Sequence, residues 1–185
     1  MKLFTCIVFW GIGWGTFALA QPSDFQQFIN RFETATLPLA FERNFWESQP
    51  VLTDNLITPA DAEAYLGVEL FEGKLLSMVG YYKKFAVSED IVALLFWMRD
   101  QDTVGDFHKT LYLATVSLST QKPIDDVFVG GYGYWAGVYE HWDLATIRPD
   151  FTILKKVDYT DYDLKAKRKD KFQNTIQPDG FISDK

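Results

Sequence analysis

The amino-acid sequence predicts a mainly β protein: an antiparallel meander forming a barrel or a sandwich, with one or two short N-terminal helices. Helical periodicity is confined to the part before Gly73, and strand-like periodicity continues from there. Turn-forming residues separate the later apolar segments, at 121–123 and 148–150. Parallel crossovers need a dozen or more residues, so these short connections favour antiparallel neighbours.

The first twenty residues have the pattern of a secretory signal peptide. Lys2 precedes an apolar run over residues 3–17, and Ala18 and Ala20 supply the small side chains that signal peptidase accepts. The alternative is an uncleaved anchor, because the segment just reaches the lower length limit for spanning a bilayer. Its small residues favour cleavage. We therefore expect a signal peptide at 1–20, a periplasmic or extracellular protein, and no stable membrane span after cleavage.

The remaining chain, residues 21–185, is expected to form a single β-rich globular domain. Cleavage removes the only cysteine, Cys6, so packing and not disulfide bonding must supply its stability. The whole chain is acidic and aromatic-rich, with 25 acidic against 18 basic residues and a net charge of −7. An acidic chain repels phosphate backbones, so we expect no nucleic-acid partner.

The first helix is expected to begin at Ser23, which forms a capping box with Gln26. Four apolar residues then fall on one stripe, at i, i+3, i+4 and i+7. They are Phe25, Phe28, Ile29 and Phe32.

A strand should follow over residues 37–41, where apolar residues alternate around Pro38. The second helix should begin after Thr58, with Pro59 in its first position, and should end at Gly67. It is expected to bury Ala62, Tyr65 and Leu66.

Residues 91–98 are continuously apolar, which predicts a central strand covered on both faces. Residues 110–118 alternate, and this places Tyr112, Ala114, Val116 and Leu118 on one face. Further strands are expected over 74–85, 124–129, 140–147, 151–158 and 165–176, with a short last one after a turn at 178–180.

Several of these segments carry a resemblance to known proteins. They are the helix with Phe28 and Phe32, the turn Leu37-Pro38-Leu39, and the segments 112–115, 124–126 and 147–153. In this pattern the chain resembles small exported bacterial proteins of uncharacterised function. The resemblance implies export and a β-rich fold. It implies no activity and no site residues.

The candidate contact surface is the segment 130–142, which concentrates aromatic residues among glycines. Glycines let a loop bend, and amphipathic rings offer flat faces with hydrogen-bonding tips, which suits a sugar ring or a protein partner. The alternative, favoured by the usual burial of large rings, is that they cover one end of the core and the glycines form bulges. The predicted binding residues are Tyr132, Tyr134, Trp135, Tyr139, His141 and Trp142.

Two segments resemble known sequence motifs, but each departs from its motif where the function depends on it. Residues 131–136 match the G-x-G-x-x-A pattern of dinucleotide-binding proteins. Dinucleotide binding requires close approach of the backbone and a helix after the motif, but here bulky rings fill the segment and no helical stripe follows. Residues 100–108 resemble the start of a calcium loop, but Val104 and Leu111 stand where oxygen ligands belong. We expect a turn there, and no metal or cofactor.

No catalytic residue is predicted. His108 and His141 have no close metal-ligating companions, and no serine-nucleophile motif occurs. Carboxylates are paired in the sequence, but the sequence does not show whether they face each other across a cleft, as glycoside hydrolysis requires. The pairs are Asp125 with Asp126, Glu140 with Asp143, and Asp158 with Asp161.

Lysines alternate along one predicted strand, which would place four ammonium groups on one face. The favoured explanation is an edge strand protected against sheet extension. The alternative is a cationic strip for an anionic cell-envelope polymer. The residues are Lys165, Lys167, Lys169 and Lys171.

These observations favour a protein that is not an enzyme, although they leave catalysis open. The predicted function is that of an exported, non-catalytic binding or cell-envelope accessory protein of unknown ligand. Its expected partner is an envelope polysaccharide or another protein. The alternative is a carboxylate-dependent hydrolase acting on an envelope polysaccharide.

Overall fold

The computed structural model describes residues 24–48, 55–68, 78–99, 107–135 and 137–184. The backbone alone is described for Arg99, Phe107, His108 and Trp135. The predicted signal peptide and residues 100–106 of the acidic loop lie outside these ranges. Within them, no helix has the length and apolar character needed to cross a membrane.

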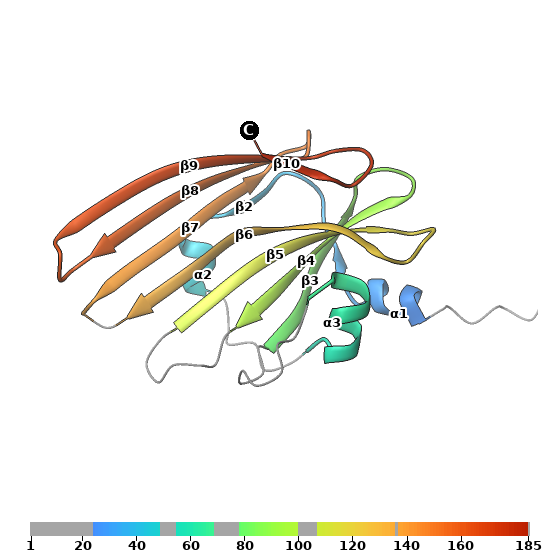
Figure 1. Ribbon diagram of the computed structural model, residues 1–185, viewed down its shortest axis with the longest axis horizontal. Coiled ribbons are helices and arrows are strands. Elements are labelled where there is room, and N and C mark those ends of the chain that lie inside the picture. Colours follow the sequence, from blue (N-terminus) through green and yellow to red (C-terminus); the bar gives the residue numbers. More distant parts are fainter. Residues whose placement is uncertain (1–23, 49–54, 69–77, 100–106, 136, 185) are drawn as a thin grey trace, which may run out of the picture.

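The described residues form three helices and ten strands (Figure 1). The helices are α1 (Asp24–Asn30), α2 (Arg43–Ser48) and α3 (Pro59–Leu66). The strands are β1 (Glu33–Thr34), β2 (Leu39–Phe41), β3 (Met78–Ala86), β4 (Ile91–Arg99), β5 (Phe107–Ser117), β6 (Pro123–Trp135), β7 (Tyr139–Ile147), β8 (Thr152–Asp161), β9 (Ala166–Ile176) and β10 (Ile182–Asp184).

All ten strands belong to one sheet with the order β1-β3-β4-β5-β6-β7-β8-β9-β10, and β2 pairs with β7 beside this path. Every pairing is antiparallel except that of β1 with β3. The predicted mainly β, antiparallel fold is confirmed. Of the two forms that the sequence left open, the barrel does not occur: the sheet is not closed.

The sheet divides at β6. This strand pairs with β5 along most of its length, but it pairs with β7 only from Gly131 to Trp135. Beyond that point β2 takes the place beside β7. A Cβ atom on Gly130 would lie 2.6 Å from the carbonyl oxygen of Asp143, so glycine permits the close approach of the two strands where they begin to separate.

One face of β3, β4 and β5 is covered by α1 and α3. The predicted stripe of α1 is buried there, and Phe28 packs with its ring centroid 4.8 Å from that of Tyr65 of α3. The ends of α3 are also as predicted. Thr58 Oγ1 accepts a hydrogen bond from the Asp61 amide at 3.2 Å, and Gly67 caps the helix with a φ of 69°.

The opposite face of β4 and β5 contributes to a second core. Leu95 and Leu113 lie in one cluster with Trp46 of α2 and with Ile147 and Ile153 from the ends of β7 and β8. Strand β4 is therefore covered on both faces, as its apolar sequence predicts, and every side chain from Ile91 to Trp97 is buried.

Strands β6 and β7 are longer than predicted. The aromatic and glycine-rich segment forms the end of β6 and the start of β7, with a turn at Gly137 and Val138, and is not a long loop. Gly130 of this segment pairs with Leu111 of β5, and the register of β5 against β6 shifts just after this pair.

Candidate functional site

Alternation along β7 divides the predicted binding residues between two faces of the sheet. We call the face that carries Tyr139, His141 and Asp143 the cavity face. The opposite face, with Glu140 and Trp142, is called the lysine face. The six predicted residues therefore do not form one surface, and only the backbone of Trp135 is described.

The aromatic residues of the lysine face pack against one another. Trp142 is buried and its ring centroid lies 4.1 Å from that of Tyr132, its cross-strand partner. The Trp142 indole Nε1 donates to Glu140 Oε1 at 2.7 Å, and the Arg43 guanidinium lies 4.6 Å above the Trp142 ring. Tyr134, which pairs with Glu140, is partly buried. Trp142 thus serves mainly to support this face.

The cavity face holds a hydrogen-bonded pair of a histidine and an aspartate. His141 Nε2 lies 3.2 Å from Asp143 Oδ1, and the exposed fractions of the two side chains are 38% and 10%. Strand alternation places residues i and i+2 on the same face, which makes this contact local. The hydrogen bond to Asp143 raises the pKa of His141 above its ordinary value.

This pair borders a hollow of about 580 Å³, which lies between β6 and the strands β7, β8 and β9. The hollow exists because β6 separates from β7, and side chains from both sides of the separation line it. Its residues are Phe128, His141, Asp143, Lys155, Val157, Tyr159, Arg168, Asp170 and Phe172.

Each charged group in the lining has a partner. Arg168 forms an ion pair with Asp170, two residues along β9. Lys155 Nζ donates to the Phe128 carbonyl oxygen at 3.3 Å, across the gap between β8 and β6. Burial lowers the pKa of Lys155. The hollow therefore contains cations and carboxylates in a balanced arrangement.

The rest of the lining is aromatic or aliphatic. The Tyr159 ring meets the His141 ring edge-on at 5.9 Å, and it lies 6.0 Å from the predicted residue Tyr139. Phe172 is 50% exposed, although it is a large apolar side chain. A concave, mostly apolar site with a few converging polar groups is typical of small-ligand binding.

Asp143 contributes a carboxylate to the lining of this hollow. His141 engages Oδ1, and the side chain as a whole remains 10% exposed. A carboxylate oxygen in such a site accepts hydrogen bonds from hydroxyl or amine groups of a ligand. The described lining contains no serine, threonine or cysteine that could act as a nucleophile.

The three carboxylate pairs noted in the sequence do not face across a cleft. Asp125 and Asp126 are neighbours on β6, and Glu140 and Asp143 stand three residues apart on β7, as Asp158 and Asp161 do on β8. Strand alternation therefore places the two members of each pair on opposite faces. In the part of the chain that the structure describes, no three His, Cys, Asp or Glu side chains come together as a metal site would require.

Sequence reasoning identified His141 but missed the rest of this hollow. Phe128, Tyr159, Arg168 and Asp170 come from three other strands, and their position depends on register and on the separation of β6 from β7. The period-two pattern does place His141 and Asp143 on one face, and this was the available signal.

The fold and the hollow define a class: a β-rich protein with an open, aromatic-lined pocket beside a His–Asp pair. Comparisons with protein-family models, with curated proteins and with solved structures found no match for this chain. The function is therefore argued from the site itself.

Proposed function

We propose that this chain is an exported, non-catalytic binding protein and that it holds a saccharide unit of an envelope polysaccharide in the hollow of the cavity face. The leader pattern of residues 1–20 supports export. The lining supports a ligand that has both hydroxyl groups and an apolar ring face.

The observation that carries this proposal is the position of Asp143. Its side chain is 10% exposed and borders the hollow, and His141 engages one of its two oxygens. A sugar hydroxyl would donate to the other oxygen. A hydrogen bond to a charged group contributes more than one between neutral groups.

The rings of Tyr159, Phe128 and Phe172 supply the second part of the recognition. A pyranose ring has a face of C–H groups, and aromatic faces are flat, apolar and slightly negative, so the two surfaces are complementary. Exposure of Phe172 at the rim agrees with a ligand that enters from the side of β9.

Binding is favoured over hydrolysis because both lining carboxylates are engaged by neighbouring side chains. Asp143 pairs with His141, and Asp170 pairs with Arg168. A glycoside hydrolase needs one carboxyl group free to deliver a proton and a second placed to act on the sugar ring. The alternative of a carboxylate-dependent hydrolase therefore lacks a free carboxyl group among the described lining residues.

The test is calorimetry of the mature protein against a panel of neutral oligosaccharides: cello-, chito- and malto-oligosaccharides and disaccharide units of cell-wall glycan. We expect at least one to bind. Asp143→Asn should weaken that binding by about tenfold or more, because a charged hydrogen bond is lost. Tyr159→Ala should also weaken it, whereas Tyr159→Phe should retain the ring contact and most of the affinity.

Tyr162→Ala is the matched control, since Tyr162 is an exposed tyrosine just after β8 that hydrogen-bonds to Glu140 of the lysine face. Equal binding by wild type, Asp143→Asn and Tyr159→Ala would contradict the proposed site. Failure of the whole panel to bind would contradict the ligand class. Release of new reducing ends during incubation would establish the hydrolase instead.

A further inference from the structure

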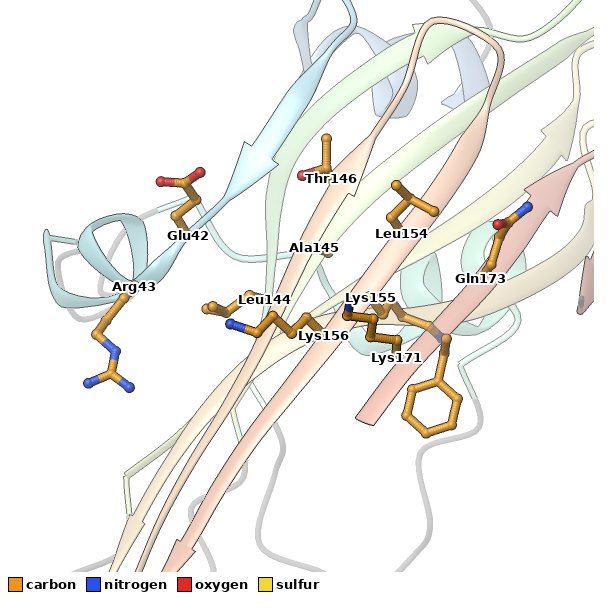
Figure 2. A pocket seen from close by; sticks show the side chains of 11 residues that line it. Glu42, Arg43, Leu144, Ala145, Thr146, Leu154, Lys155, Lys156, Lys171 and Gln173 are labelled. Atoms are coloured by element: carbon orange, nitrogen blue, oxygen red, sulfur yellow. The ribbon is translucent and has the colours of Figure 1, made fainter. Parts of the chain in front are cut away.

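The lysine face carries a second hollow, next to the saccharide site proposed above. This groove has a volume of about 710 Å³ and lies over β7, β8 and β9 beside the start of α2. Figure 2 shows side chains from these elements surrounding it. Its lining is Glu42, Arg43, Leu144, Ala145, Thr146, Leu154, Lys155, Lys156, Lys171, Phe172 and Gln173. Lys155 and Phe172 also border the hollow of the cavity face.

The groove is strongly basic in an acidic chain. Arg43, Lys156 and Lys171 supply cations to it, the ammonium of a fourth lining cation, Lys155, is bonded to the Phe128 carbonyl oxygen, and Glu42 is the single acid in the lining. The chain as a whole has a net charge of −7. A neighbouring hollow shares Arg43 and continues over the far ends of β8 and β9, where Lys165 and Lys167 line it together with Glu140 and Asp161. Positive charge is therefore gathered along this face.

Part of that charge is not neutralised by the protein. Asp158 pairs with Lys156 at 3.3 Å and with Lys169 at 3.7 Å. In the described residues, no carboxylate lies within ion-pair distance of Lys167 or Lys171. Both are exposed on β9. These two ammonium groups are free to meet an external anion.

Protection of an edge strand does not explain the whole arrangement. The edge of β9 is indeed unpaired from Ala166 to Gln173 in the described sheet, because β10 pairs only with Asn174 to Ile176. Lysines on β9 therefore discourage sheet extension. But Lys156 belongs to β8, an internal strand, and Arg43 to α2, and neither position needs such protection.

The spacing of the charges fits a repeating ligand. Lys167, Lys169 and Lys171 are two residues apart on one strand, which places successive residues about 7 Å from each other along the sheet. Lysine acts as a point charge on a flexible stem, so a row of lysines tolerates small mismatches with a chain of anions. A single small anion would use only one or two of them.

The uncharged part of the groove indicates what lies between the anions. Leu144 and Leu154 give it an apolar floor, while Thr146 and Gln173 offer a hydroxyl and an amide. These groups suit ring C–H faces and hydroxyls. We propose that the lysine face binds an acidic polysaccharide whose repeating units carry carboxylates, that is, a polyuronate. The acidic chain disfavours the denser charge of a nucleic acid.

The experiment measures binding of polygalacturonate to the mature protein by calorimetry at low ionic strength. The variant is Lys167→Gln/Lys171→Gln, which should weaken binding about tenfold. Wild-type binding should weaken steadily with added salt, because exposed charges are screened. Lys167→Arg/Lys171→Arg should restore binding, since it keeps the charges.

Lys83→Gln/Lys122→Gln is the matched control, with the same change in net charge and both positions on other strands or turns. It should bind polygalacturonate like wild type. Size-exclusion chromatography checks that the β9 variant remains soluble and in the wild-type association state, and the arginine variant tests the proposal should the glutamine variant aggregate.

Three results would overturn the proposal. The first is equal affinity of wild type and the Lys167/Lys171 variant for polygalacturonate, and the second is equal binding of neutral dextran. The third is tighter binding of a single-stranded oligonucleotide or of vesicles with anionic lipids, which would assign the face to another class of polyanion. The Asp143→Asn variant should bind polygalacturonate like wild type, even where it no longer binds the neutral oligosaccharide. The two sites are therefore tested separately.

Discussion

Strands β4 and β9 belong to the same sheet but differ in what covers them. Every side chain of β4 from Ile91 to Trp97 is buried, between α1 and α3 on one face and the second core on the other. Residues 166–169 of β9 are all exposed. This segment carries charged side chains on both faces of the sheet. No packing contact among the described residues requires them there. The comparison shows which half of the molecule is exposed.

The boundary between the covered and the exposed parts of the sheet lies within β7. Ala145 and Ile147 are part of the second core, whereas His141 and Asp143 on the same face of the strand border a hollow. Figure 1 shows β7, β8 and β9 extending beyond the part of the sheet that α1 and α3 cover. We call β3–β5 with their helices the closed half, and the extending strands the open half.

The largest expected effect is a core truncation in the closed half. Phe28→Ala removes a ring that is 3% exposed and contacts Phe32, Tyr65 and Tyr81. It should lower the free energy of unfolding by about 3–5 kcal/mol, because the cavity cannot fully collapse. Denaturant melts measure this. Phe172→Ala in the open half is the matched control and should cost under about 1 kcal/mol. Similar losses for both would remove the distinction between the halves.

The boundary between the halves depends on Gly130. A methyl group there would lie 2.6 Å from the Asp143 carbonyl oxygen and 3.1 Å from the Trp46 ring. Gly130→Ala should therefore force the strands apart and cost about 1–3 kcal/mol of unfolding free energy.

Gly137→Ala separates this packing effect from backbone strain. Gly137 has a φ of 79° but open space around its Cβ position, so its cost should be about 1 kcal/mol and purely conformational. If the Gly130 variant is no less stable than the Gly137 variant, close approach does not determine where β6 and β7 separate.

A helix cap in the closed half gives a smaller effect. Thr58→Ala removes the acceptor for the Asp61 amide and should cost about 1 kcal/mol in thermal or denaturant unfolding. Thr58→Ser should retain most of the stability. Thr160→Ala on β8, in the open half, should change the free energy of unfolding by less than about 0.5 kcal/mol. A neutral Thr58→Ala would show that α3 does not depend on its cap.

The smallest expected effect is a pH dependence in the open half. The pKa of His141 is raised in the folded protein, so folding is favoured by protonation of this group. Its contribution is complete below the unfolded pKa of about 6.5 and disappears as the pH rises through the folded pKa. Because the imidazole is more than one-third exposed, the contribution should stay below about 1 kcal/mol.

An NMR titration of His141 measures this pKa directly. The Asp143→Asn variant should show a lower pKa for His141 than wild type, since the hydrogen bond to a carboxylate is lost. A wild-type pKa at or below the ordinary value of histidine would contradict the hydrogen bond between His141 and Asp143.

The closed half was largely predictable from local sequence signals. Thr58 and Gly67 mark the ends of α3, and the unbroken apolar run of β4 requires cover on both faces. Helix α2 was not predicted. It has six residues and buries Trp46 alone, and its position depends on the stacking of Phe45 on Trp97 of β4, which is distant in the sequence.

The site was also predictable only in part, because contacts between residues that are distant in the sequence determine it. His141 was identified from its aromatic and glycine-rich surroundings, but its neighbours Arg168 and Asp170 reach the hollow through the register of β8 and β9. Trp142 was assigned to the same surface as His141, although adjacent strand residues face opposite ways. Lys165 falls just before β9, with a φ of 52°, so three of the four predicted lysines belong to the strand.

Chemical-shift mapping of the isotope-labelled protein, residues 21–185, tests the central claim that ligands contact the open half. Neutral oligosaccharide should shift the amide signals of residues 141–143, 157–159 and 168–172. Polygalacturonate should shift those of residues 167–171 and Lys156. Neither ligand should shift the signals of β3, β4, α1 or α3. Shifts centred on α1, α3 or β4 would contradict the account, as would shifts spread evenly over both halves.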